Sequence, residues 1–159
     1  MDAVAELLNA ARRELGEVPR EALGVWRSRR ILGIPAAARI VPAGSAWHLG
    51  VLLLTDDAVL ATGEVVRARE EVRRGFAAES QRERAAIAAA AFRGGFAEGQ
   101  SVHVGWETID PDAVDAASSP LRLGAGGPLV RWSAAGGFMP LGAYLAERVA
   151  LARTPPAGA

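Results

Sequence analysis

The 159-residue sequence predicts an α+β fold, a mostly antiparallel sheet with an N-terminal helix, an inserted Ala-rich helix and a C-terminal capping helix. Two observations support this class. Segments with strand-like alternation outnumber segments with helical periodicity, and the two kinds do not alternate along the chain as they do in doubly wound folds. The length is typical of one domain, which we expect to span residues 1–153, followed by a flexible tail at 154–159.

The N-terminal helix is predicted at residues 3–15, where apolar side chains recur at helical spacing. Asp2 is placed to cap its first turn, and Gly16 follows its last turn. Proline and glycine interrupt the next stretch, residues 17–38, which indicates short helix and loop there.

Apolar alternation predicts five strands, at residues 47–55, 59–66, 101–109, 121–123 and 129–132. The first two flank Asp56-Asp57, which indicates a tight hairpin. Residues on the inward faces of these strands should form the core, and the expected core members are Trp47, Leu49, Val51, Leu53, Val102, Val104 and Trp106.

Two further helices are indicated by their start signals. Ser80 and Glu83 have the spacing of a capping box, which opens an Ala-rich helix that runs to Arg93. Met139-Pro140 begins the last helix, with proline near its first position. One side of that helix is apolar, with Leu141, Tyr144, Leu145, Val149 and Ala152 in helical register.

Composition excludes several classes of catalytic chemistry. The chain has neither lysine nor cysteine, and all 18 of its basic residues are arginine. It therefore lacks a Schiff-base lysine, a P-loop lysine, a Ser–Lys pair, a thiol nucleophile, a disulfide and a thiolate zinc site. No serine lies in a nucleophile elbow, which argues against a serine triad. Arginine without lysine, together with abundant alanine, indicates a GC-rich bacterial genome.

The sequence also predicts a cytoplasmic protein. Its first residues show no basic segment followed by an apolar run, the pattern of a secretory signal. The longest dense apolar run, Leu49 to Leu54, is far shorter than the ~20 residues that a membrane-spanning helix needs. We therefore expect no transmembrane segment.

Charge is sorted along the chain although the formal net charge is zero. Residues 12–39 carry seven arginines and three glutamates, a net charge of +4, and residues 98–115 carry five acids and no arginine, a net charge of −5. The two regions either meet or are simply solvated, and the alternative is a basic patch for an anion. The overall neutrality argues against a dedicated nucleic-acid-binding protein.

The two histidines form the first candidate site. His48 and His103 both lie in predicted strands, each two residues before a glycine, and Glu107 shares the predicted face of His103. Two imidazoles and one carboxylate suit a transition metal, so one interpretation is a small hydrolase or metal-assisted enzyme that uses these three residues. The other is packing, in which Gly50 and Gly105 leave room for the Ala-rich helix. We adopt the packing interpretation and expect no metal and no cofactor.

The densest basic and aromatic cluster forms the second candidate site. Trp26, Arg27, Arg29 and Arg30 combine a stacking ring with guanidinium groups, which favour phosphate and carboxylate. We assign ligand binding to these four residues. The Gly-rich stretch 124–127 is interpreted as a hairpin turn, because no helix starts after it to aim N–H groups at a phosphate.

Two family resemblances accompany these motifs. The segment from Leu49 to Ala61 and the final amphipathic helix resemble bacterial pleckstrin-homology-like and GRAM-like domains over about residues 39–152. This resemblance implies a non-catalytic scaffold that binds lipids or proteins. The segment from Val65 to Phe96, with Arg-Arg-Gly-Phe and Arg-Gly-Gly-Phe, resembles short actinobacterial proteins labelled glutaminase. Serine-dependent glutaminases resemble Ser–Lys enzymes, and this chain has no lysine.

These observations favour a small non-catalytic binding or interaction module over an enzyme. Its expected partner is a protein or an anionic ligand, with no role for nucleic acid. Two alternatives stay open, the His48, His103 and Glu107 enzyme and a structural subunit that works as a homo-oligomer. A site shared by both imidazoles would favour the enzyme, and a large exposed apolar patch would favour the oligomer.

Overall fold

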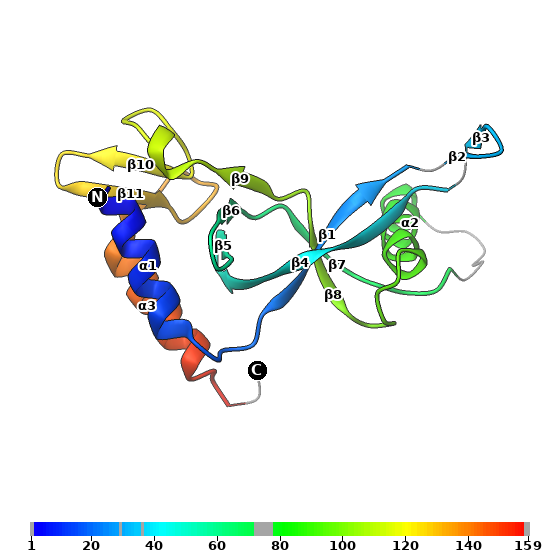
Figure 1. Ribbon diagram of the computed structural model, residues 1–159, viewed down its shortest axis with the longest axis horizontal. Coiled ribbons are helices and arrows are strands. Elements are labelled where there is room, and N and C mark those ends of the chain that lie inside the picture. Colours follow the sequence, from blue (N-terminus) through cyan, green and yellow to red (C-terminus); the bar gives the residue numbers. More distant parts are fainter. Residues whose placement is uncertain (1, 29, 36, 72–77, 158–159) are drawn as a thin grey trace. The chain divides into compact units, whose positions relative to one another are not determined.

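The computed structural model describes residues 2–28, 30–35, 37–71 and 78–157, and for 30–31 and 34–35 it describes the backbone. It confirms an α+β fold (Figure 1). The described residues contain three α-helices and one short 3-10 helix, which are α1 (Ala3–Leu15), α2 (Glu79–Arg93), α3 (Leu141–Arg153) and η1 (Pro111–Ala113). None of these helices is both long and apolar enough to cross a membrane.

The strands are short apart from the first and fourth. They are β1 (Glu21–Arg27), β2 (Arg30–Ile31), β3 (Ile34–Pro35), β4 (Arg39–Leu49), β5 (Leu52–Leu54), β6 (Val59–Ala61), β7 (Glu64–Arg67), β8 (Ser101–Val104), β9 (Glu107–Ile109), β10 (Leu121–Gly124), β11 (Gly127–Arg131) and β12 (Phe138–Pro140). β1 and β8 are parallel. Pairing is antiparallel in β4–β5, β5–β6, β6–β9, β7–β8, β2–β3, β10–β11 and β11–β12.

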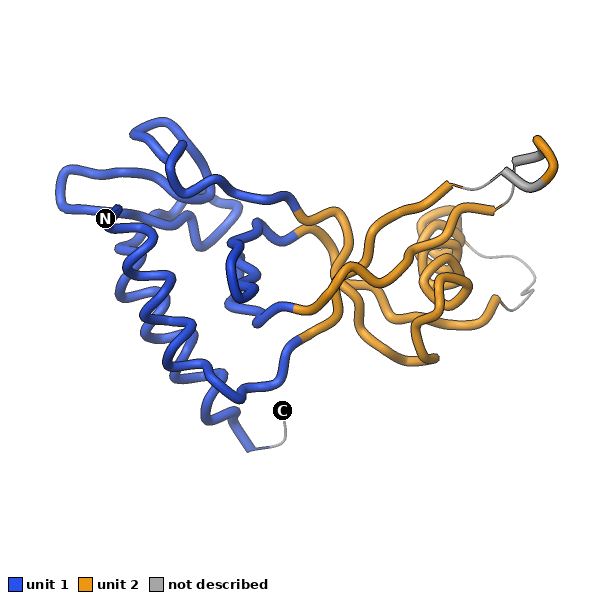
Figure 2. The backbone as a smooth tube through the Cα atoms, in the orientation of Figure 1, with its two compact units in different colours: residues 1–20, 46–62, 107–159 blue, residues 21–45, 63–106 orange. Residues whose placement is uncertain are grey.

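The chain divides into two compact units, shown in blue and orange in Figure 2. Unit 1 comprises residues 1–20, 46–62 and 107–159, and unit 2 comprises residues 21–45 and 63–106. Strand β4 belongs to unit 2 up to residue 45 and to unit 1 from residue 46. In unit 1 the strand order is β4–β5–β6–β9, beside a separate sheet β10–β11–β12, and in unit 2 it is β7–β8–β1–β4.

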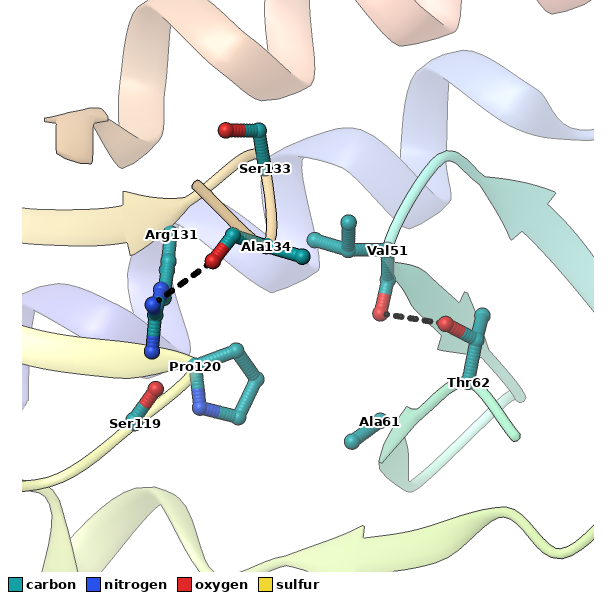
Figure 3. A pocket seen from close by; sticks show the side chains of 8 residues that line it. All are labelled: Val51, Ala61, Thr62, Ser119, Pro120, Arg131, Ser133 and Ala134. Atoms are coloured by element: carbon teal, nitrogen blue, oxygen red, sulfur yellow. Dashed lines mark hydrogen bonds between the residues drawn. The ribbon is translucent and has the colours of Figure 1, made fainter. Parts of the chain in front are cut away.

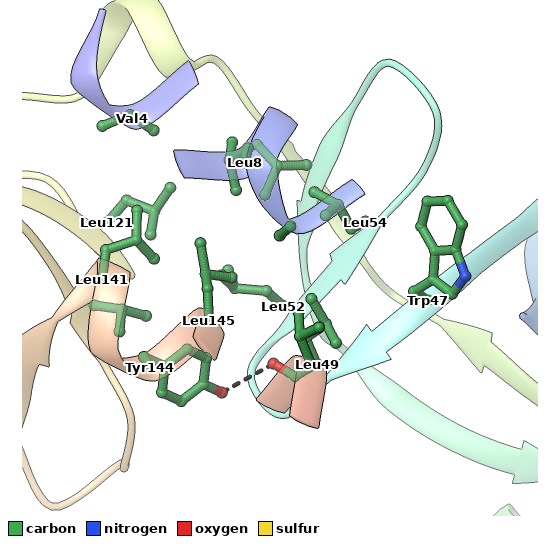
Figure 4. Close-up of a cluster of buried hydrophobic side chains, with 14 of the residues drawn as sticks. Val4, Leu8, Trp47, Leu49, Leu52, Leu54, Leu121, Leu141, Tyr144 and Leu145 are labelled. Carbon is green, nitrogen blue, oxygen red and sulfur yellow. Dashed lines mark hydrogen bonds between the residues drawn. The ribbon is translucent and has the colours of Figure 1, made fainter. Parts of the chain in front are cut away.

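Unit 1 holds the larger apolar core, which Figure 4 shows. Helices α1 and α3 lie side by side (Figure 1), and their apolar side chains pack in one cluster with residues of the strands. Burial of this surface away from water is the main stabilising contribution to such a unit. The buried members include Val4, Leu8, Leu15, Trp47, Leu49, Leu52, Leu54, Leu121, Leu141, Tyr144, Leu145 and Val149.

Unit 2 has a smaller core beneath helix α2. The alanines Ala90 and Ala91 of this helix pack in one cluster with Ile40, Phe96 and Val102. Small side chains let the helix approach the strands closely. The packing interpretation expected Gly50 and Gly105 to leave room for this helix. Gly50 instead lies in a turn with φ of +65°, and Gly105 lies in a bend with φ of +70°. An added Cβ at Gly50 would meet Tyr144, and at Gly105 only the Gly63 Cα within 4 Å.

The N-terminal and C-terminal helices confirm their predictions. α1 spans the predicted residues 3–15, and the Asp2 carboxylate accepts a hydrogen bond of 3.2 Å from the Val4 N–H. α3 begins at Leu141 rather than at Met139, because Phe138–Pro140 pairs with β11 as strand β12. The predicted hairpin around residues 124–127 is also present, as β10 and β11.

Three strand and loop predictions are wrong, and a glycine lies in each of the three segments. Residues 21–27 form strand β1 instead of helix and loop, and Gly24 is there because a Cβ would overlap Ile40 and Val102. Residues 47–55 form two strands, since the chain reverses at Gly50. Residues 101–109 are likewise divided at Gly105 into β8 and β9.

The predicted hairpin at Asp56-Asp57 therefore joins β5 to β6, and the second strand ends at Ala61 rather than Val66. Leu52, Leu53 and Leu54 are all buried, so both faces of β5 are covered, and Val51 is half-buried in the turn at Gly50. Trp106 is also half-buried, and its indole N–H donates to the Gly24 carbonyl at 3.1 Å. The other five predicted core residues, Trp47, Leu49, Leu53, Val102 and Val104, are buried.

The predicted capping box is wrong as well. Helix α2 begins at Glu79, its N-cap is Ala78, and no side chain caps its first turn. Ser80 thus lies in the first turn of the helix and not at the N-cap, the position from which a side-chain oxygen accepts from the N2 or N3 N–H.

Substitutions at Asp2 and Ser80 give a direct stability test of the two cap assignments. Asp2→Ala is expected to lower the free energy of unfolding by about 1 kcal/mol, because it removes a side-chain cap. Ser80→Ala is expected to change it by less than about 0.5 kcal/mol, because Ser80 is exposed and no side chain caps this helix. Urea unfolding followed by circular dichroism measures both. A loss at Ser80 equal to that at Asp2 would contradict the cap assignment.

Candidate functional site

A pocket of about 360 Å³ opens in unit 1 (Figure 3). Four separate chain segments contribute to it, which are the β4–β5 turn, the end of β6, the segment before β10 and the end of β11 with the turn that follows. Its lining residues are Val51, Ala61, Thr62, Ser119, Pro120, Arg131, Ser133 and Ala134. In Figure 3, Val51, Ala61 and Thr62 face the other five residues across the pocket.

The first wall is built on the end of strand β11. The Arg131 N–H donates to the Pro120 carbonyl at 2.8 Å, which ties β11 to the segment before β10. Beyond Arg131, the Gly136 N–H donates to the Ser133 carbonyl at 3.2 Å and closes the turn toward β12. Backbone bonds therefore place Arg131, Ser119 and Ser133 at one edge of the pocket.

The opposite wall is fixed at Val51. Its carbonyl accepts hydrogen bonds from the Thr62 N–H at 3.2 Å and the Thr62 hydroxyl at 3.3 Å. Its N–H donates to the Tyr144 hydroxyl at 2.8 Å, and that hydroxyl donates to the Leu49 carbonyl at 2.9 Å. The buried tyrosine of α3 thus anchors the turn that carries this wall.

Arg131 is the only charged residue among the described residues that line this pocket. Its Nη2 donates to the Ala134 carbonyl at 3.0 Å, and its Nε is buried with no hydrogen-bond partner. No described carboxylate lies within ion-pair distance of this guanidinium. A guanidinium has five N–H donors, so Arg131 retains hydrogen-bonding capacity that the described chain does not use.

Other arginines of unit 1 are engaged within the chain. Arg20 pairs with Asp56 and stacks on the Trp47 ring, with 3.8 Å from its Cζ to the ring centroid. Arg12 donates to the Thr55 carbonyl at 2.8 Å and the Ala58 carbonyl at 3.0 Å. Desolvation by burial lowers the pKa of Arg12, and the charges of Asp57 and Asp56 oppose this shift. The acids that act on these two arginines are thus Asp56 and Asp57.

A second, smaller pocket of about 210 Å³ adjoins the first in unit 1. Ala61, Ser119 and Pro120 line both pockets. The charged residues that line the second pocket are acidic and include Glu107 and Asp110, whereas Arg131 is the charged residue of the first pocket.

The histidine prediction has a different outcome for each residue. His48 is exposed at the end of β4, with its Nε2 at 2.9 Å from the Gly50 carbonyl oxygen, in unit 1. His103 is fully buried in β8, in unit 2, with its Nε2 at 3.2 Å from a Glu21 carboxylate oxygen. The carboxylate beside His103 is therefore that of Glu21, and Glu107 lies in unit 1 at the start of β9. The enzyme hypothesis stays a prediction.

Sequence reasoning missed Glu21 because it assigned no strand to residues 17–38. The parallel register of β1 and β8 sets Leu23 opposite His103, so Glu21, two residues before Leu23, lies on the same face. The short continuous apolar run from Ala22 to Trp26 was the signal that could have revealed this strand.

The predicted arginine cluster is described only in part. Trp26 is 46% exposed and Arg27 is exposed at the end of β1. Arg29 lies outside the described residues, and for Arg30 the structure describes the backbone in β2. Ligand binding by this surface stays a prediction.

Comparison with protein families, curated proteins and solved structures gives no match to this chain. The resemblances to pleckstrin-homology-like, GRAM-like and glutaminase-labelled proteins therefore stay predictions, and the function is argued from the pocket itself.

Proposed function

We propose that the protein is a non-catalytic module that binds a small organic anion in the Arg131 pocket. The observation that supports this most is the guanidinium of Arg131, which lines the pocket and has no described carboxylate partner. Arginine suits carboxylate and phosphate groups because its planar donors match their oxygens. A bound anion would supply hydrogen-bond acceptors for the Arg131 N–H donors that the described chain does not use.

The rest of the lining suits an organic ligand with a short apolar part. Val51, Ala61 and Pro120 offer apolar contact, and Ser119 and Ser133 add hydroxyl groups to the lining. Ligand pockets combine an apolar lining with a few polar groups in this way, and their volumes run from about 300 to 1,000 Å³. The volume of about 360 Å³ fits a small molecule at the low end of that range.

Binding without catalysis follows from what lines the pocket. Three described lining residues have a hydroxyl group of the kind that serves as a catalytic nucleophile. They are Ser119, Ser133 and Thr62. None of the described lining residues is a His, Asp or Glu that would activate a hydroxyl as a general base. The pocket therefore has a recognition group and no acid–base pair.

Replacing Arg131 tests the proposal. We expect the protein to bind butanoate, hexanoate or octanoate, and Arg131→Gln to weaken that binding by about tenfold, the loss typical of a charge-assisted hydrogen bond. Isothermal titration calorimetry measures the affinity. Arg153→Gln, at an exposed position of α3, is the matched control and should bind like the unaltered protein.

Two results would contradict the proposal. One is the absence of binding by all three carboxylates in the unaltered protein. The other is an equal loss of affinity in Arg131→Gln and Arg153→Gln, which would indicate a non-specific charge effect. Unfolding curves of both variants show whether the fold is retained.

A further inference from the structure

The smaller pocket in unit 1 adds acidic groups next to the Arg131 pocket. The two pockets share Ala61, Ser119 and Pro120 as a common wall. Strands β6 and β9 pair so that Ala61 lies directly opposite Glu107. Directly opposed residues of antiparallel strands point to the same face with Cβ atoms about 4.5–5.5 Å apart. Glu107 therefore lies beside Ala61, a residue that lines both pockets.

The negative charge at this end is not neutralised by described basic side chains. No Arg or His among the described residues is within ion-pair distance of Glu107 or Asp110. The sequence shows the same imbalance, because residues 98–115 contain five acids and no arginine. One Asp110 oxygen accepts from the Asp112 N–H at 3.0 Å and caps η1, which holds the Asp110 side chain in place.

We propose that the ligand is a zwitterion, with a carboxylate at Arg131 and an ammonium group at Glu107 and Asp110. This inference rests on the proposed function, because it keeps the anionic group in the Arg131 pocket. The apolar wall of Ala61 and Pro120 lies between the two charged ends, so the ligand has a hydrocarbon segment between its charges.

An organic cation fits the acidic end better than a divalent metal ion does. Ca²⁺ takes about six to eight oxygen ligands. The pocket offers two carboxylates, and one oxygen of Asp110 already accepts a backbone hydrogen bond. An ammonium group has three N–H donors and needs far fewer acceptors.

Matched probes separate this inference from the proposed function. We compare butanoate, hexanoate and octanoate with their ω-amino counterparts, which differ only in the added ammonium group. The ω-amino acid of the best chain length is expected to bind about fivefold more tightly than its parent, a gain at the upper end of the range for an exposed ion pair. The preference should decrease as salt concentration rises.

Neutralising the acids gives the second arm of the experiment. The double variant Glu107→Gln, Asp110→Asn should bind the ω-amino acid no more tightly than the parent carboxylate, and asparagine still caps η1. Glu147→Gln, at an exposed position of α3, is the control and should keep the preference. Arg131→Gln should weaken binding of both probes.

Each outcome addresses one proposal. If the parent carboxylate binds through Arg131 but the ω-amino acid binds no more tightly, the zwitterion inference is overturned and the proposed function stands. If the double variant keeps the preference, the acidic pocket is not the ammonium site and the inference is likewise overturned. If no probe binds, both proposals fail.

Discussion

Leu145→Ala is expected to lower the free energy of unfolding by about 3 kcal/mol. Leu145 is 3% exposed and packs in the core of unit 1, between helix α3 and the strands. Truncation removes apolar surface from the core and leaves a cavity, and both effects destabilise the fold. Urea unfolding followed by tryptophan fluorescence measures the change.

Leu151→Ala provides the matched control on the same helix. Leu151 is 44% exposed, so the identical substitution should change stability by less than about 0.5 kcal/mol. Helix propensity changes equally in both variants, and the difference between them isolates packing. Equal midpoints for the two variants would show that α3 does not bury the face containing Leu145.

Gly94→Ala is expected to have an effect of similar size in unit 2, about 3 kcal/mol. Gly94 follows helix α2 with φ of −76°, a conformation that alanine adopts without strain. The added Cβ, however, would overlap the backbone carbonyl of Ile40 in strand β4. A backbone carbonyl cannot turn aside as a side chain can, so α2 and β4 would have to separate.

Gly126→Ala is the control for a glycine with free space around it. No atom lies within 4 Å of the Cβ position at Gly126, and its φ is not positive. Alanine there should be neutral or slightly stabilising, by up to about 1 kcal/mol, because it restricts the unfolded chain. Thermal unfolding measures both variants, and a Gly94→Ala protein as stable as Gly126→Ala would rule out close packing of α2 on β4.

Local signals predicted the elements whose geometry is local. The cap at Asp2 and the stop at Gly16 delimited α1, and the glycines between β10 and β11 indicated their hairpin. The chain reversal at Gly50 and the division of the predicted strand at Gly105 could not be predicted from alternation. A glycine inside an apolar run has the same pattern whether it continues a strand or takes a positive φ.

The pocket could not be predicted from the sequence because its residues are distant along the chain. Val51, Ser119 and Arg131 carry no motif, and only the tertiary fold brings them to one site. One feature of the site does appear in the sequence, the acidic stretch 98–115. Two of its acids, Glu107 and Asp110, line the second pocket. Within the basic region 12–39, Arg20 pairs with Asp56, and the charges of Asp57 and Asp56 act on Arg12.

The interleaving of the two units along the chain has a consequence for synthesis. Unit 2 is complete once residue 106 has been made, whereas unit 1 needs its first 20 residues, residues 46–62 and everything from residue 107. Helix α1 is therefore synthesised long before α3, its neighbour in the core. Until α3 is made, the apolar face of α1 lacks this neighbour and stays uncovered. Contacts between segments so far apart slow folding and expose the nascent chain to aggregation. A chaperone that shields α1 until the last helix emerges should raise the yield of folded protein.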